Sequence, residues 1–177
     1  MKRIILITGG QRSGKSVKAE ELALSLSSTP VFMATAHVWD EEFRQRIAQH
    51  QQRRGSQWTN IEEERWLSRH DLKGRVVVVD CITLWCTNFF FNPDAADGSP
   101  QPTVSEALDE LKAEFDRLTS QDATFIFVTN EIGSGAVSDN AVQRRFTDLQ
   151  GWMNQYVASR ADEVILMVSG IAVTIKK

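Results

Sequence analysis

The chain has 177 residues, of which 42% are hydrophobic and 24% charged, values typical of an ordinary globular protein. This length predicts one domain spanning residues 1–177. Twenty basic against twenty-three acidic residues give a net charge of −3, which excludes bulk electrostatic binding to nucleic acid or to an anionic membrane. Any recognition of phosphate must therefore be local.

The amino-terminal segment and the cysteines predict a cytoplasmic protein. Met1-Lys2-Arg3 is followed by only about five apolar residues before Gly9, which is too short for the core of a signal peptide or for a membrane span. Cys81 and Cys86 lie five positions apart in one segment. This pattern favours buried, reduced thiols over a zinc site or a secreted disulfide framework.

Short, nearly continuous apolar runs recur along the chain and are typical of strands buried on both faces of a sheet. They occupy residues 4–8, 31–35, 76–80, 125–129 and 164–169. Between them, apolar residues follow helical spacing within residues 19–26, 108–118 and 146–157. The alternation of strands and helices predicts an α/β fold with a mostly parallel sheet flanked by helices.

Two connections break this alternation. Ser169-Gly170 separates apolar residues 164–168 from 171–175, and so short a connection predicts a tight hairpin. The last strand should therefore be antiparallel and lie at or near an edge. Residues 92–102 are rich in Pro, Asp, Gly and Ser and predict a surface loop.

A phosphate-binding loop follows the first predicted strand. Its residues are Gly9, Gly10, Gln11, Arg12, Ser13, Gly14, Lys15 and Ser16. They match G-x-x-x-x-G-K-[ST] between a strand and an amphipathic helix, which is the context that this motif requires. Backbone N–H groups and the helix N-terminus would face a triphosphate, while Lys15 would reach its β and γ oxygens.

Two residues are candidate ligands of a magnesium ion. The Ser16 hydroxyl occupies the motif position that binds Mg²⁺ in phosphate loops. The run of valines at 76–79 ends in Asp80. In many nucleotide sites a second strand also ends in a carboxylate that lies near the metal ion. Together they predict a magnesium nucleoside triphosphate as the ligand.

Residues 39–54 predict a helix with a cationic side. The apolar positions, spaced by four, are Trp39, Phe43 and Ile47, and the polar stripe holds Arg46, His50, Arg53 and Arg54. One hypothesis is that the imidazole attacks an α-phosphorus while the guanidinium groups stabilise the developing charge. The alternative is a solvated basic helix face with an incidental histidine, and helical spacing alone favours this second interpretation.

Further short motifs are spread over nearly the whole chain. They are residues 34–36, Arg46-Ile47 with His50 and Arg54, Trp58 with Glu62, residues 80–85 with Thr87-Asn88, residues 128–135, residues 161–164 and residues 168–171. With the phosphate loop, these segments resemble the bifunctional adenosylcobinamide kinase and adenosylcobinamide-phosphate guanylyltransferase family of cobalamin biosynthesis. Ala136-Val137-Ser138 departs from the family, which usually has a proline at this turn.

The resemblance implies a RecA-type nucleotide-binding fold, a homotrimer and a corrinoid substrate. It implies that adenosylcobinamide is phosphorylated by ATP or GTP, and that His50 then takes GMP from GTP and passes it on to give adenosylcobinamide-GDP. The nucleotide contacts that it implies beyond residues 9–16 are Ala34, Thr35, Ala36, Gln51, Gln52, Arg53, Arg54, Glu62 and Leu84. The catalytic pair would be His50 and Lys15, while the role of Glu131 stays open between orienting a hydroxyl or water and a structural hydrogen bond.

Two other functions compete with this one. A small-molecule kinase with the same loop would transfer only the γ-phosphoryl group and form no covalent nucleotide. A nucleotide-dependent switch would bind GTP and a protein partner, but the chain lacks an obvious N-K-x-D motif for guanine.

Overall fold

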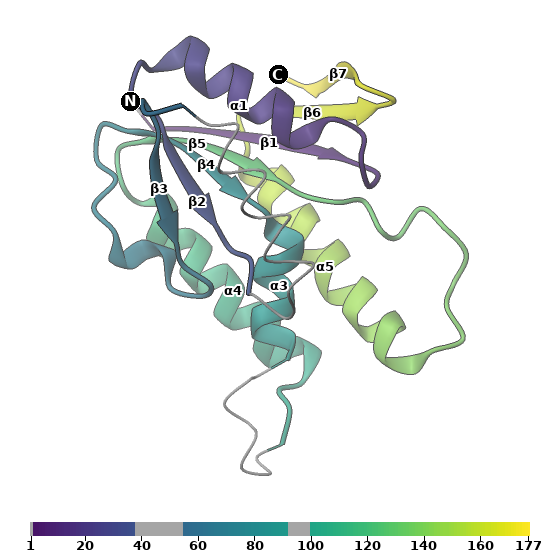
Figure 1. Ribbon diagram of the computed structural model, residues 1–177. Coiled ribbons are helices and arrows are strands. Elements are labelled where there is room, and N and C mark those ends of the chain that lie inside the picture. Colours follow the sequence, from purple (N-terminus) through teal and green to yellow (C-terminus); the bar gives the residue numbers. More distant parts are fainter. Residues whose placement is uncertain (1, 38–54, 92–99) are drawn as a thin grey trace.

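The computed structural model describes residues 2–37, 55–91 and 100–177, and these residues build one twisted sheet with helices on both faces (Figure 1). The strands are β1 (Arg3–Gly9), β2 (Val31–Ala34), β3 (Thr59–Glu62), β4 (Val76–Asp80), β5 (Thr124–Val128), β6 (Glu163–Val168) and β7 (Ile171–Lys176). Their order across the sheet is β3-β2-β4-β5-β1-β6-β7. Every neighbouring pair is parallel except β6 and β7, which confirms the predicted antiparallel hairpin at an edge.

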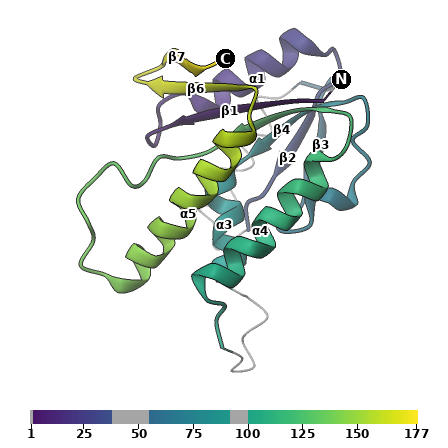
Figure 2. The ribbon, with the colours of Figure 1, turned by 180° about the vertical axis from the view of Figure 1, so that it is seen from behind.

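The helices divide between the two faces of the sheet. They are α1 (Lys15–Leu26), α3 (Ile82–Phe90), α4 (Val104–Thr119) and α5 (Ala141–Arg160), with a short 3-10 helix, η1, at Leu67–Arg69. Helix α1 covers one face, and α3, α4 and α5 cover the other (Figures 1 and 2). Because both faces are covered, the central strands are apolar throughout, as a buried parallel sheet requires.

Alternating side chains of β1 belong to the two halves of the core. Ile5 and Ile7 belong to the cluster under α1, whereas Ile4 and Leu6 belong to the larger cluster under α3, α4 and α5. All four are at most 3% exposed. The first strand is therefore fixed on both sides, and the loop that follows it starts from a rigid point.

The helix predictions are confirmed for the segments that the structure describes. In α4 the predicted apolar stripe is buried, and Thr103 with Glu106 forms a capping box at its start. Helix α5 starts after Asn140, whose side chain accepts hydrogen bonds from the N–H groups of Val142 and Gln143. The helix predicted over residues 39–54 lies outside the described residues, as does most of the predicted loop at 92–102.

Both cysteines are free and buried, as predicted. Burial raises the pKa of the Cys81 thiol to about 12 and raises that of Cys86 further above its ordinary value. Neither thiol therefore forms an appreciable amount of thiolate near neutral pH. No described helix is long and apolar enough to cross a membrane.

Candidate nucleotide site

The phosphate loop joins the end of β1 to the first residue of α1. The backbone has positive φ at Gly9, Arg12 and Gly14, with values of 149°, 57° and 95°. Gly9 and Gly14 adopt such angles at no steric cost, and this lets the chain curl back before the helix starts. Lys15 is the first residue of α1, so the loop opens directly on a helix N-terminus.

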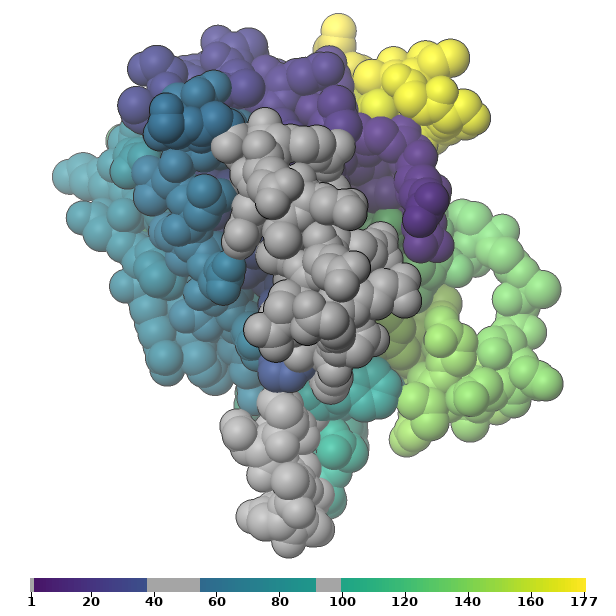
Figure 3. Space-filling view, viewed as in Figure 1, coloured from purple at the N-terminus to yellow at the C-terminus, as the bar shows by residue number. Residues whose placement is uncertain are grey.

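The carboxyl-terminal hairpin supports this loop. Gly170, in the turn between β6 and β7, donates its backbone N–H to the carbonyl oxygen of Ser13 at 3.1 Å. A Cβ atom added to Gly14 would lie 3.5 Å from the Gly170 Cα. In the space-filling view the purple amino-terminal segment and the yellow hairpin lie side by side (Figure 3).

The two adjacent glycines of the loop should respond differently to alanine. A Cβ on Gly9 would overlap the Met167 carbonyl oxygen and lie 2.9 Å from Ser13 Oγ, whereas a Cβ on Gly10 would meet no atom within 4 Å. We expect Gly9→Ala to lower the free energy of unfolding by about 2–4 kcal/mol through overlap and backbone strain. Gly10→Ala should change it by less than about 0.5 kcal/mol. Urea unfolding of the two variants tests this, and equal effects would contradict it.

Lys15 is buried within the phosphate loop. Its side chain is 6% exposed, and Nζ donates to the Gly10 carbonyl oxygen at 2.6 Å. Burial lowers the pKa of Lys15, while the nearby Cys81 and Asp80 act in the opposite direction. A buried ammonium group next to a carboxylate and a curled backbone is suited to an anion carrying several negative charges.

The register of the sheet brings the predicted residues to one edge. Ala34 is aligned with Glu62 on β3 and with Asp80 on β4, and Asp80 is in turn aligned with Val128 on β5. Strand β5 lies between β4 and β1, so one strand separates Asp80 from the phosphate loop. The carboxyl ends of parallel strands are where α/β proteins bind ligands.

The segment after β2 is tied to the segment after β4. The Thr35 hydroxyl donates to the Cys81 carbonyl oxygen and accepts from the Cys81 N–H, both at 2.8 Å. Asn88 of α3 donates to the carbonyl oxygens of Thr35 at 2.7 Å and Glu64 at 2.8 Å. Thr35 is completely buried and its hydroxyl is engaged with Cys81, whereas Ala34 and Ala36 on either side of it are half-buried.

The remaining predicted residues divide into three groups. Ser16 lies in the first turn of α1 and is half-buried, and Glu62 is exposed at the end of β3. Leu84 lies on α3 and packs against the cluster under α1. His50 and residues 51–54 lie outside the described residues.

A buried polar network at the same edge was missed from the sequence. Its members are Thr83 of α3, Thr129 and Asn130 after β5, and Gln150 and Asn154 of α5. Gln150 and Asn154 are 0% and 8% exposed. A signal was available, because these two amides, four residues apart, border the predicted apolar stripe of α5.

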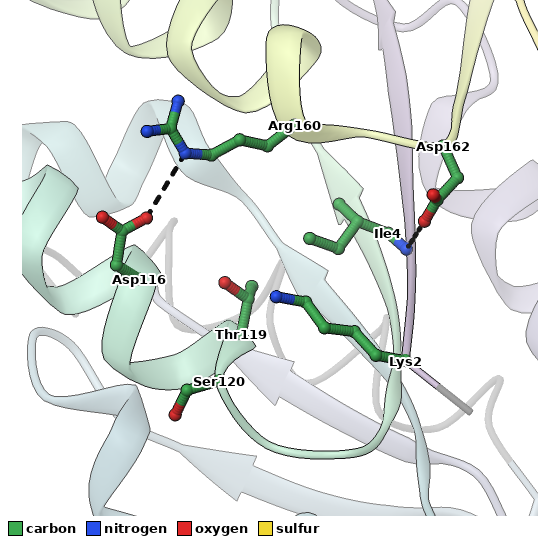
Figure 4. A pocket seen from close by; sticks show the side chains of 7 residues that line it. All are labelled: Lys2, Ile4, Asp116, Thr119, Ser120, Arg160 and Asp162. Carbon is green, nitrogen blue, oxygen red and sulfur yellow. Dashed lines mark hydrogen bonds and ion pairs between the residues drawn. The ribbon is translucent and has the colours of Figure 1, made fainter.

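A pocket of about 420 Å³ lies at the opposite end of the sheet, where β1 begins (Figure 4). Asp162 accepts the Ile4 N–H at 2.7 Å, and Arg160 lies 3.4 Å from Asp116. In Figure 4 the Lys2 side chain extends toward Thr119. Most of the charged groups here are engaged in holding β1, α4 and α5 together, away from the phosphate loop.

The loop, the parallel sheet and the strand inserted between β1 and β4 define a P-loop nucleotide-binding protein. Solved structures share this fold. The chain is similar to a prototypical ATPase from the type III secretion system of pathogenic bacteria, with a TM-score of 0.57 and 14% identity over 97% of this chain and 56% of that one. It is also similar to the flagellar accessory protein FlaH from Methanocaldococcus jannaschii, with a TM-score of 0.51 and 17% identity over 98% and 78% of the two chains. These similarities concern the fold alone.

The family is defined by sequence. Residues 5–175 match the model of the cobinamide kinase / cobinamide phosphate guanyltransferase family, and the chain belongs to this family. It is 37% identical to the bifunctional adenosylcobalamin biosynthesis protein CobU of Escherichia coli K12, over 98% of this chain and 99% of that protein. It is also 37% identical to the bifunctional adenosylcobalamin biosynthesis protein CobP of Pseudomonas aeruginosa, over 97% and 96%. The chain is therefore a bifunctional kinase and guanylyltransferase of cobalamin biosynthesis, and the predicted family is confirmed.

Proposed function

We propose that the phosphate loop holds the triphosphate for both reactions at the carboxyl end of β1. In the kinase reaction the substrate is adenosylcobinamide and the donor is ATP or GTP. A bond forms between the substrate's hydroxyl oxygen and the γ-phosphorus, the bond to the β-phosphate oxygen breaks, and a nucleoside diphosphate leaves. Lys15 neutralises charge that develops on the β and γ oxygens, and the buried position of its ammonium group is the observation that carries this proposal.

Ser16 and Asp80 are proposed to hold a magnesium ion together with the phosphates. A hydroxyl and a carboxylate are hard oxygen donors, and Mg²⁺ in nucleotide sites is bound through few protein groups with waters and phosphate oxygens completing its shell. The described residues contain no group of three or more His, Cys, Asp or Glu side chains that could hold a metal ion. When bound, the ion would neutralise part of the phosphate charge.

His50 is proposed as the nucleophile of the guanylyl-transfer reaction. Its ring nitrogen forms a bond to the α-phosphorus of GTP, and the bond to the β-phosphate oxygen breaks to release pyrophosphate. A phosphate oxygen of adenosylcobinamide phosphate then displaces the imidazole and gives adenosylcobinamide-GDP. The family membership supports this role, and Arg46, Arg53 and Arg54 lie close to His50 in the sequence, where guanidinium groups could stabilise the phosphate charge.

The nucleotide is proposed to extend from the phosphate loop along the carboxyl edge of the sheet. Ala34 and Ala36 after β2 and Glu62 at the end of β3 lie along this edge, and Leu84 lies on α3. Gln51, Gln52, Arg53 and Arg54 are proposed to add contacts from the His50 segment.

The proposed pair of reactions is tested by supplying each substrate separately. Adenosylcobinamide with ATP should give adenosylcobinamide phosphate, and adenosylcobinamide phosphate with GTP should give adenosylcobinamide-GDP and pyrophosphate, each followed by mass spectrometry. A product from the first mixture alone would favour the competing kinase without a covalent intermediate.

A homotrimer is proposed as the assembled form. Four exposed apolar residues of the hairpin support an interface, namely Val168, Ile171, Val173 and Ile175, which are 47–67% exposed. Light scattering at micromolar concentration should give the mass of three chains, and the mass of one 20.0 kDa chain would contradict it. The cytoplasmic location stays a prediction, as does the single domain, which the shared sheet of all described strands supports.

A further inference from the structure

A carboxylate follows β5, the strand that lies between the phosphate loop and Asp80. Glu131 comes three residues after Val128, the last residue of β5. Its backbone N–H donates to the carbonyl oxygen of Gly9 at 3.0 Å. The main chain at Glu131 is therefore fixed to the first residue of the phosphate loop, at the sheet edge where β1 and β5 both end (Figure 1).

The buried polar network fixes the two residues before Glu131. The Thr129 hydroxyl donates to Asn154 Oδ1 at 2.7 Å, and the Asn130 N–H donates to the Thr83 hydroxyl at 3.0 Å. Gln150 Nε2 donates to the Asn130 carbonyl oxygen and to the Thr129 hydroxyl. Side chains of α3 and α5 thus hold both residues of this segment by several hydrogen bonds, and the segment is fixed in place.

The Glu131 side chain itself takes no part in this network. It is exposed, and its carboxylate has no hydrogen bond or ion pair with any residue of the described ranges 2–37, 55–91 and 100–177. This disfavours a structural hydrogen bond as its role. The backbone of Glu131 is therefore held next to the phosphate loop while its carboxylate is left exposed and unpaired among the described residues, as a group that must reach a bound substrate requires.

We propose that Glu131 is the catalytic base of the kinase reaction. Its carboxylate takes the proton of the substrate hydroxyl as that oxygen bonds to the γ-phosphorus and the nucleoside diphosphate leaves. In guanylyl transfer the attacking atoms are an imidazole nitrogen and a phosphate oxygen, which attack through lone pairs and do not need a base there. Glu131 is therefore specific to one of the two reactions, and the inference rests on the proposed kinase chemistry at this loop.

Glu131→Gln tests this because it keeps the shape of the side chain and removes the proton acceptor. We expect the kinase kcat to fall at least about 100-fold, the typical contribution of a general base. The KM for the nucleotide should change less than about threefold, as should the rate at which supplied adenosylcobinamide phosphate is guanylylated. Asp139→Asn, an exposed acid in the connection between β5 and α5, is the matched control and should retain kinase activity.

Each of the following results would overturn the proposal. Full kinase activity in Glu131→Gln would remove Glu131 from the chemistry. Equal loss of both reactions would assign Glu131 to the binding of metal or nucleotide instead of proton transfer. A wild-type protein without kinase activity would contradict the proposed function itself, and the guanylyl-transfer assay separates that failure from a failure of the Glu131 assignment.

Discussion

Lys15→Ala is expected to lower both the kinase rate and the guanylyl-transfer rate by at least about 100-fold, because both reactions need the β and γ phosphates to be held. Lys15 is buried in the loop, and its ammonium group, bonded to the Gly10 carbonyl oxygen, would exchange that contact for phosphate contacts with a bound nucleotide. Rates of the two half-reactions, measured at saturating corrinoid, give the effect on each.

The fold should survive this substitution. Burial lowers the pKa of Lys15, so the folded protein disfavours its charge, and removing the ammonium group relieves that cost. The exposed Gly10 carbonyl can bond to water instead. The melting temperature should be unchanged or higher, and Lys112→Ala, on α4 across the sheet, should leave both rates unaltered. A folded Lys15→Ala variant with full activity would remove the loop from the mechanism.

His50→Ala is expected to abolish guanylyl transfer while leaving kinase activity at least partly intact. Without the imidazole no covalent carrier of GMP can form, whereas γ-phosphoryl transfer needs no covalent intermediate. The two rates should therefore separate in this variant, unlike in Lys15→Ala. Assays of both reactions in parallel measure that separation.

The other histidines provide the control. His70 lies 3.6 Å from Glu63 and His37 lies 2.8 Å from Glu64, so both already have acidic partners. His70→Ala should retain guanylyl transfer. Retained transfer in His50→Ala, or its loss in His70→Ala, would place the nucleophile elsewhere.

The sequence predicted the strands that are buried on both faces and the loop that follows the first of them. These elements carry strong local signals, because an apolar run and a glycine motif each occupy consecutive residues. It did not predict β3, where Ile61 is the only large apolar residue of Thr59–Glu62. An edge strand with so little buried surface has no pattern to detect.

Helix α3 was missed for the opposite reason. Six of the nine residues of Ile82–Phe90 are buried, and an apolar run of only nine residues cannot be told from a buried strand by its pattern alone. The strand order was equally hidden, because alternation of strands and helices does not say that β5 separates β1 from β4. The polar network around Thr129 and Asn130 depends on that order, since it joins α3 to α5 across the end of β5.

In the proposed mechanism, GMP passes through a covalent bond to His50 while the triphosphate is held by the phosphate loop. This mechanism is tested most directly by incubating the wild-type protein and Mg²⁺ with GTP labelled at either the α or the γ phosphate, and counting the label retained after denaturation. The α label should remain on the protein, map to the peptide containing His50, resist alkali and be released by acid, as a nitrogen–phosphorus bond requires, while the γ label should not remain. No retained α label, or α label on any other residue, would contradict this mechanism.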